Sequence, residues 1–222
     1  YSVVITDANN CIQYDTVNLL QPSEITNDSS LTVVNNIDCN GNSTGSINIS
    51  PTGGTLPYSF VWSNGANSED LNNIPAGTYS VNILDSFLCS SVSYTYTLIE
   101  PSALNISSTT NSVSCNGLSD GSIDAFVSGG IASYNYVWSN GDSTEDISGL
   151  SAGTYTLQVY DMNNCSFSDS IVVSEPTLLQ ASLSANSTSL TSLATGGISP
   201  YDYFLVGPSG FTASSLGNAG VS

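Results

Sequence analysis

The feature that most constrains the fold of this chain is an internal repeat with a period of about 76 residues. The segment Tyr58–Gly65 (YSFVWSNG) returns as Tyr134–Gly141 (YNYVWSNG), and Cys39–Gly41 returns as Cys115–Gly117. A unit of this length exceeds a solenoid repeat and suits one small all-β domain. Tandem domains of one kind provide reach, multivalency or mechanical length, so the repeat favours a structural or binding role over catalysis.

Alternating apolar and polar residues predict short β-strands inside each repeat. Ser46–Ile49 and Tyr79–Ile83 alternate with a period of two. Asn64-Gly65 is a two-residue hairpin signal, because both central positions of that turn require a positive φ. No window shows the period of an amphipathic helix. The sequence therefore predicts an all-β chain of tandem immunoglobulin-like β-sandwiches, each with about six or seven strands.

Two Glu-Pro pairs, at 100–101 and 175–176, divide the chain into four segments. We expect the C-terminal part of a truncated repeat at 1–22, complete repeats at 23–101 and 102–176, and at 177–222 the N-terminal part of a divergent repeat without the Cys-Asn-Gly segment. Proline fixes φ, so the linkers should be semi-rigid and extended. The out-of-phase ends indicate a window on a longer protein. The alternative is that the 222 residues are a mature chain, in which case residues 1–22 would pair with another molecule's partial domain.

The composition excludes several classes of function. The chain has no Lys, Arg or His against 18 acidic residues, a formal net charge of −18. Such a surface repels nucleic acid phosphates and anionic lipids, and no apolar run is long enough to enter a membrane. Serine triads, Schiff-base chemistry and bidentate arginine clamps are impossible without these residue types. We therefore expect no enzyme activity.

The spacing of the cysteines predicts one disulfide in each complete repeat. Cys39 and Cys89 are 50 positions apart, as are Cys115 and Cys165. Cys11 then has no partner within the 222 residues, because it belongs to the truncated first repeat. Disulfides indicate an oxidising compartment, outside the cell or at its surface. The alternative is that the cysteines are reduced and buried.

Four aromatic residues recur at equivalent positions of the two complete repeats: Trp62, Trp138, Tyr79 and Tyr155. The strand alternation points the tryptophans inward, and each tyrosine follows an Ala-Gly-Thr segment in the manner of a tyrosine corner. The alternative is that these rings form an exposed platform that binds sugars.

Recurrent acidic residues are the only candidates for acid–base or metal chemistry: Glu69, Asp70, Glu145, Asp146, Asp85 and Asp161. Glu69-Asp70 and Glu145-Asp146 are neighbours on the chain, so in a strand they point to opposite faces and do not form a catalytic pair. No cofactor is expected, although loop carboxylates could hold calcium at a domain junction. The alternative is that Asp85 and Asp161 cap the turn before the cysteine.

The order of these motifs resembles the SprB repeat: Cys-Asn-Gly, Gly-Ser-Ile, Gly-Gly, Tyr-x-Tyr/Phe-Val-Trp-Ser-Asn-Gly, Ala-Gly-Thr-Tyr, Asp-x-x-x-Cys and Glu-Pro. The resemblance covers 23–101, 102–176 and the partial repeat at 1–22. It weakens over 177–222, where Phe204 lies nearest to the expected tryptophan. It implies a segment of a very large adhesin, exported by the type IX secretion system to the outer-membrane exterior of a gliding bacterium.

The resemblance also implies partners and modifications. The partners would be neighbouring repeats of the same chain, an extracellular substratum or polysaccharide, and the motility and secretion machinery. Thr16, Ser143 and Ser170 follow aspartates in a pattern similar to the O-glycan acceptor of the same bacterial group. Two functions remain open: an adhesive filament acting in gliding motility through multivalent contacts, and a secreted carbohydrate-binding module.

Overall fold

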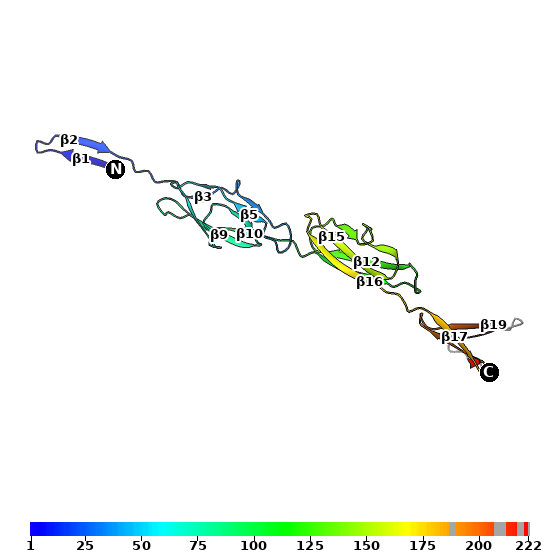
Figure 1. Cartoon of the computed structure of the whole chain (residues 1–222). Coiled ribbons are helices and arrows are strands. Elements are labelled where there is room, and N and C mark those ends of the chain that lie inside the picture. Colours follow the sequence, from blue (N-terminus) through cyan, green and yellow to red (C-terminus); the bar gives the residue numbers. More distant parts are fainter. Residues whose placement is uncertain (187–189, 207–211, 217–219, 222) are drawn as a thin grey trace. The chain divides into compact units, whose positions relative to one another are not determined.

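The computed structural model describes residues 1–186, 190–206, 212–216 and 220–221 (Figure 1). Within these residues the chain is all-β and has no helix, and thus none that could cross a membrane. It forms two compact units, one ending at Pro101 and the other beginning at Ser102. The sequence analysis expects a repeat boundary at the same position.

The second complete repeat is a sandwich of two three-stranded antiparallel sheets. One sheet has the order β11-β12-β14 and the other β13-β15-β16. The bounds are β11 Asn105–Asn111, β12 Gly121–Ser128, β13 Asn135–Trp138, β14 Ile147–Leu150, β15 Gly153–Tyr160 and β16 Ser166–Val173. These orders match strands A-B-E and C-F-G of an immunoglobulin domain, which confirms the predicted fold class.

The first complete repeat has the same topology, with its first two strands each divided in two. Its strands are β3 Thr26–Asn27, β4 Val33–Asn35, β5 Gly45–Asn48, β6 Pro51–Thr52, β7 Ser59–Trp62, β8 Leu71–Ile74, β9 Gly77–Leu84 and β10 Tyr94–Leu98. The sheets are β4-β5-β8 and β10-β9-β7, with β3 paired to β6. Asp28 breaks the first strand by accepting hydrogen bonds from the Ser30 N–H and hydroxyl, and Pro51 has no N–H to donate.

Each sandwich encloses one core, built by the period-two alternation of its strands. On β15, Leu157 and Val159 are fully buried and their neighbours face outward. On β9, Val81 and Ile83 occupy the same places. The two cores have matching members, with Trp62 in one and Trp138 in the other. Repetition of the sequence thus repeats the packing.

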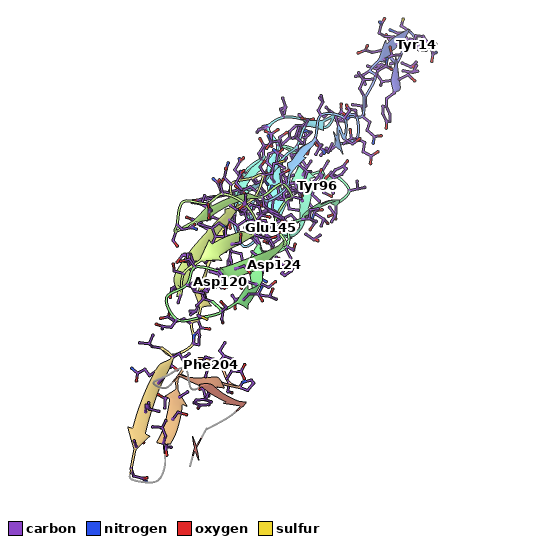
Figure 2. All side chains as sticks on the ribbon, turned by 90° about the vertical axis from the view of Figure 1, so that its right-hand side faces the viewer. Tyr14, Tyr96, Asp120, Asp124, Glu145 and Phe204 are labelled. Carbon is purple, nitrogen blue, oxygen red and sulfur yellow. The ribbon has the colours of Figure 1, made fainter. Side chains whose placement is uncertain are left out.

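The two end segments hold fewer described strands than the complete repeats. Residues 1–22 contain a hairpin of β1 (Ser2–Thr6) and β2 (Ile12–Thr16), whose side chains are all exposed. The last segment contains β17 Gln180–Ala185, β18 Leu190–Thr195, β19 Asp202–Val206, β20 Thr212–Leu216 and β21 Gly220–Val221. Phe204 is 69% exposed and does not replace the missing tryptophan (Figure 2), whereas Tyr203 is buried.

Close packing at Gly121 generates a stability prediction. A Cβ at this position would lie 2.7 Å from Val173 Cγ1 and 3.0 Å from the Leu150 carbonyl oxygen. Gly121→Ala should therefore lower the free energy of unfolding of this repeat by about 1–3 kcal/mol. Gly153→Ala is the control, because its Cβ would meet only the Tyr155 ring, at 3.9 Å. Denaturant titration read by hydrogen exchange over 102–176 measures both, and equal midpoints would contradict the prediction.

Candidate functional site: the two ends of each repeat

The Cys-Asn-Gly loop holds the departing chain at one end of each repeat, which we call the trailing end. In the first repeat the Gly41 N–H donates to Glu100 Oε2 at 2.6 Å, and Asn40 Nδ2 donates to the Pro101 carbonyl at 3.0 Å. The second repeat makes the equivalent bonds to Glu175 at 2.9 Å and to Pro176 at 3.2 Å. The Glu-Pro linker is therefore attached to the domain that precedes it.

The Gly-Gly turn holds the arriving chain at the opposite end, the leading end. The Gly54 N–H donates to the Ser23 carbonyl at 2.8 Å. Gly53 has φ +80°, and a Cβ there would lie 2.0 Å from the Glu24 carbonyl oxygen. Only glycine permits so close an approach of two backbones. The same contact recurs at Gly130 and at Gly197, so all three Gly-Gly pairs hold an incoming strand.

A buried aspartate completes the leading end. Asp85 Oδ1 accepts the N–H groups of Phe87 and Cys89, both at 2.9 Å, and Oδ2 accepts the Thr55 N–H at 3.1 Å. Asp161 is bonded in the same way in the second repeat. Each carboxylate thus ties the loop before the second cysteine to the Gly-Gly turn. The sequence allowed two interpretations of Asp85 and Asp161, turn capping and calcium binding. The hydrogen bonds observed are those of turn capping.

The hydrogen bonds to Asp85 determine its charge state. Burial by itself would raise the pKa of the carboxyl group, but the backbone N–H donors of Cys89, Phe87 and Thr55 outweigh it and hold the pKa below the usual 3.8. These donors stabilise the ionised form because each directs a partial positive charge at the carboxylate. Asp7, in the N-terminal hairpin, accepts the same bonds from Asn9 and Cys11.

The recurrent tryptophans lie in the core. Trp62 and Trp138 are each 2% exposed. Their indole N–H groups donate to the carbonyls of Ser68 and Thr144, both at 2.9 Å, so the buried polar atom is satisfied. A sugar platform requires exposed rings, whereas the rings of Trp62 and Trp138 are covered by the protein. The strand alternation places both side chains correctly.

The recurrent tyrosines form tyrosine corners at the start of the late strands. The Tyr79 hydroxyl donates to the Pro75 carbonyl at 2.9 Å, and the Tyr155 hydroxyl donates to the Ser151 carbonyl at 3.0 Å. Each bond reaches four residues upstream, as in immunoglobulin domains. This bond fixes the connection between the two sheets of the sandwich.

The remaining acidic residues do not gather into a metal site. Asp70 and Asp146 accept the N–H groups of Ile49 and Ala125, both at 3.0 Å. In the part of the chain that the structure describes, no three His, Cys, Asp or Glu side chains lie where they could hold a metal ion. Calcium binding by these carboxylates thus stays a prediction with no assembled site.

In the second repeat, Asp124, Asp146 and Glu145 form an acidic cluster, two members of which, Asp124 and Glu145, are labelled in Figure 2. Burial, and then the charges of Asp146 and Glu145, raise the pKa of Asp124. Burial, followed by the charge of Glu145, raises the pKa of Tyr136 to about 12. Asn48 occupies the position of Asp124 in the first repeat. The cluster is therefore not a property of the repeat itself.

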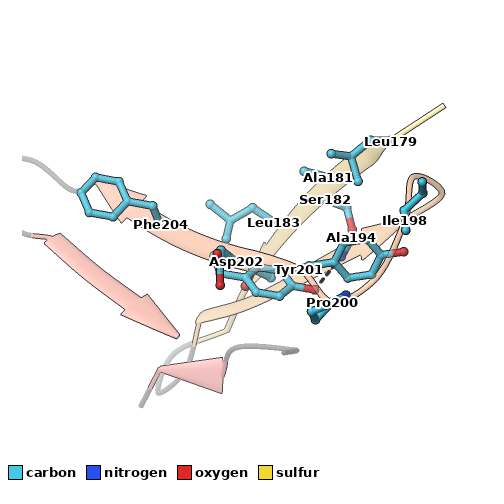
Figure 3. A pocket seen from close by; sticks show the side chains of 12 residues that line it. Leu179, Ala181, Ser182, Leu183, Ala194, Ile198, Pro200, Tyr201, Asp202 and Phe204 are labelled. Atoms are coloured by element: carbon cyan, nitrogen blue, oxygen red, sulfur yellow. Dashed lines mark hydrogen bonds between the residues drawn. The ribbon is translucent and has the colours of Figure 1, made fainter. Parts of the chain in front are cut away.

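The described residues line cavities in both units. One of about 480 Å³ opens between β17 and β19 of the last segment, with Leu183, Tyr201 and Phe204 on its walls (Figure 3). The other, of about 500 Å³, lies at the leading end of the first repeat beside Pro22, Phe87 and Cys89.

The predicted pairing of cysteines within a repeat is wrong. Cys39 and Cys165 are disulfide-bonded, but Cys89 and Cys115 are exposed free thiols, as is Cys11. The physical reason is that the loop of Cys39 lies at the trailing end and the loop of Cys89 at the leading end. Equal spacing along the chain does not bring two residues together when a full strand separates them.

The residues in the candidate O-glycan pattern are accessible. Thr16, Ser143 and Ser170 are all exposed, and the Ser170 hydroxyl lies 3.1 Å from that of Thr156. Modification of these hydroxyls stays a prediction.

The bonds of the trailing end were not predicted from the sequence. Their signal was present, because Cys-Asn-Gly is followed by Glu-Pro about 60 residues later in both repeats. Recognising it required knowing that the two segments meet.

Comparison with known proteins agrees with the motifs. The family model described as the SprB repeat matches residues 31–67 and 107–143, which confirms the resemblance. No curated protein matches the chain. Among solved structures, the N-terminal eight Ig domains of Down Syndrome Cell Adhesion Molecule are similar at 12% identity and a TM-score of 0.28. That match covers 100% of this chain and 30% of the other.

The tyrosine corner generates a prediction for Tyr79→Phe. The change removes the hydroxyl and leaves the Pro75 carbonyl without this donor, so the free energy of unfolding of the first repeat should fall by about 1–3 kcal/mol. Tyr14→Phe is the control, since Tyr14 is 64% exposed. Urea titration of both variants checks this, and a Tyr79→Phe midpoint equal to that of the control would refute it.

The lowered pKa of Asp85 predicts a pH dependence. A carboxyl with a depressed folded-state pKa stabilises the fold above its ordinary pKa, and this contribution disappears as the pH falls through the lowered value. Asp85→Asn should therefore be less stable than the wild type at neutral pH, with a smaller gap at about pH 3, where protonation of the unfolded chain's carboxyl has begun to remove this contribution. Thermal unfolding at both pH values measures it, with the exposed Glu69→Gln as control. A gap independent of pH would show that the charge is not the cause.

Proposed function

We propose that the chain, two of whose segments match the SprB repeat, is a non-catalytic repeat segment of a bacterial cell-surface adhesin. Its repeats give a filament length, stiffness and many weak adhesive contacts, and the filament acts in gliding motility. Partners on this proposal are neighbouring repeats, a polysaccharide or solid substratum, and the machinery that exports and moves the filament. Its location is the outside of the outer membrane.

The observation that carries this proposal is the attachment of the chain at both ends of each repeat. At the leading end the Gly54 N–H holds Ser23, and at the trailing end the Gly41 N–H holds Glu100. Tension applied through the linkers then enters and leaves the domain at opposite ends of its strands. Such a domain transmits force along its length, which suits a stalk.

The chemistry of the chain supports a role without catalysis. Carboxylates are the only ionisable groups besides thiols, phenols and the termini, because Lys, Arg and His are absent. The two buried aspartates that recur, Asp85 and Asp161, already accept backbone N–H groups on both oxygens. The secreted carbohydrate-binding alternative requires exposed tryptophans, and Trp62 and Trp138 are buried.

Antibody labelling of live cells tests this function. An antibody raised against the complete chain carries a fluorescent label and is added to cells that produce the protein, on glass. We expect the label to coat the cell surface, to travel along it and to stop cell movement. The same antibody preadsorbed with purified chain is the control.

Each other outcome has a definite meaning. Label that is bound but static would remove motility and leave a passive adhesive stalk. Label found in the medium and absent from intact cells would overturn the surface location and favour a secreted binding module.

A further inference from the structure

The chain contains four Asn-Gly pairs, which begin at Asn40, Asn64, Asn116 and Asn140. In an Asn-Gly pair the backbone nitrogen of the glycine can attack the side-chain amide of the asparagine, because glycine has no Cβ to block the approach. This reaction requires a group that takes the proton of the glycine N–H. The four pairs differ in the group that accepts this N–H.

At the trailing end of each complete repeat the glycine N–H donates to a carboxylate. The Gly41 N–H lies 2.6 Å from Glu100 Oε2, and the Gly117 N–H lies 2.9 Å from Glu175 Oε2. A general base must lie within hydrogen-bond reach of the proton that it removes. Both glutamates meet this requirement.

The other two pairs have a different acceptor. The N–H groups of Gly65 and Gly141 donate to the carbonyls of the preceding tryptophans, both at 3.0 Å. A peptide carbonyl oxygen is too weak a base to take the proton. A carboxylate does lie beside Asn140, but Asp142 Oδ2 accepts from the side-chain Nδ2, at 2.6 Å. These two pairs are therefore matched controls within the same molecule.

The trailing end also holds the leaving group. Asn40 Nδ2 donates to the Pro101 carbonyl at 3.0 Å, and Asn116 Nδ2 donates to the Pro176 carbonyl at 3.2 Å. One Glu-Pro pair thus supplies both the base and the acceptor that orients the amide. Asn40 and Asn116 are exposed, so water reaches the reaction product.

We propose that Asn40 and Asn116 are sites of self-catalysed deamidation, with Glu100 and Glu175 as the general bases. The glutamate takes the proton of the glycine N–H while the glycine nitrogen forms a bond to Cγ of the asparagine. The bond between Cγ and Nδ2 breaks, the proton passes to Nδ2, and ammonia leaves. Water then opens the resulting cyclic imide at either carbonyl and gives aspartate or isoaspartate. The sequence of steps consumes water and needs no oxidant or reductant.

The product releases the linker from the loop. A carboxylate has no N–H to donate to the Pro101 carbonyl. It also adds a negative charge near Glu100, in a chain without Lys, Arg or His. Each conversion therefore weakens the trailing-end attachment as the protein ages. The reaction is independent of the proposed function, whereas a resulting loss of filament stiffness rests on it.

Ageing of the complete chain at neutral pH and physiological temperature tests the proposal. Samples taken over several weeks are digested with pepsin, because the chain offers trypsin no Lys or Arg. Mass spectrometry then follows the conversion of each asparagine amide to an acid. Asn40 and Asn116 should convert at least about tenfold faster than Asn64 and Asn140. In concentrated urea the four rates should become similar, because unfolding separates each glutamate from its glycine.

Two glutamine variants identify the bases. Glu100→Gln keeps the size of the side chain and an acceptor oxygen but cannot take up the proton. It should slow the conversion of Asn40 at least about tenfold and leave that of Asn116 unchanged. Glu175→Gln should have the reverse effect, so each variant has the other repeat as its control.

Two results would overturn the proposal. Equal rates at Asn40 and Asn64 in the folded wild type would do so, and this comparison needs no variant to fold. An Asn40 rate in Glu100→Gln equal to or above that of the wild type would show that the carboxylate holds the loop without removing the proton. Neither result concerns surface location or motility, so a failure of this proposal is distinguishable from a failure of the proposed function.

Discussion

The structure depends on carboxylates that bond to backbone N–H groups, in a chain with no positively charged side chain. An acidic group here cannot form an ion pair with Lys, Arg or His, so the peptide backbone is its main charge-assisted partner. Asp85 and Asp161 connect two loops at the leading end, and Glu100 and Glu175 hold the linker at the trailing end. The same interaction therefore organises both ends of every complete repeat.

This arrangement explains why a small sandwich can serve as a link in a series. Each core is built from two three-stranded sheets around one tryptophan. The loops determine where the chain arrives and departs. Because Gly53 and Gly129 allow backbone contacts that a Cβ would block, the sequence keeps glycine where the arriving strand crosses. Two of the repeated motifs, Cys-Asn-Gly and Gly-Gly, thus hold the linkers.

Much of the fold was accessible from the sequence. Period-two alternation identified the strands and the inward side of Trp62 and Tyr79, because alternation is a local property of the backbone. Asn-Gly and Gly-Gly pairs located turns, but Asn64-Gly65 does not form the expected two-residue hairpin. Only Gly65 of this pair has a positive φ, and β7 pairs with β9 and not with β8, the strand that follows the turn. The division of the first two strands in the first repeat was not predicted. It arises from Asp28 and Pro51, whose effect depends on the partner strand.

The sequence by itself determined the kind of domain, most of its strands and much of its core. Only the tertiary structure decided which distant loops meet. Cys39 and Cys89 follow a regular spacing that suggested a bond, yet the direction of β9 carries them to opposite ends. Spacing records distance along the chain, whereas a disulfide or a hydrogen bond requires proximity in space. In a sandwich, strand direction sets that proximity, and it is established only when the sheets pair and pack.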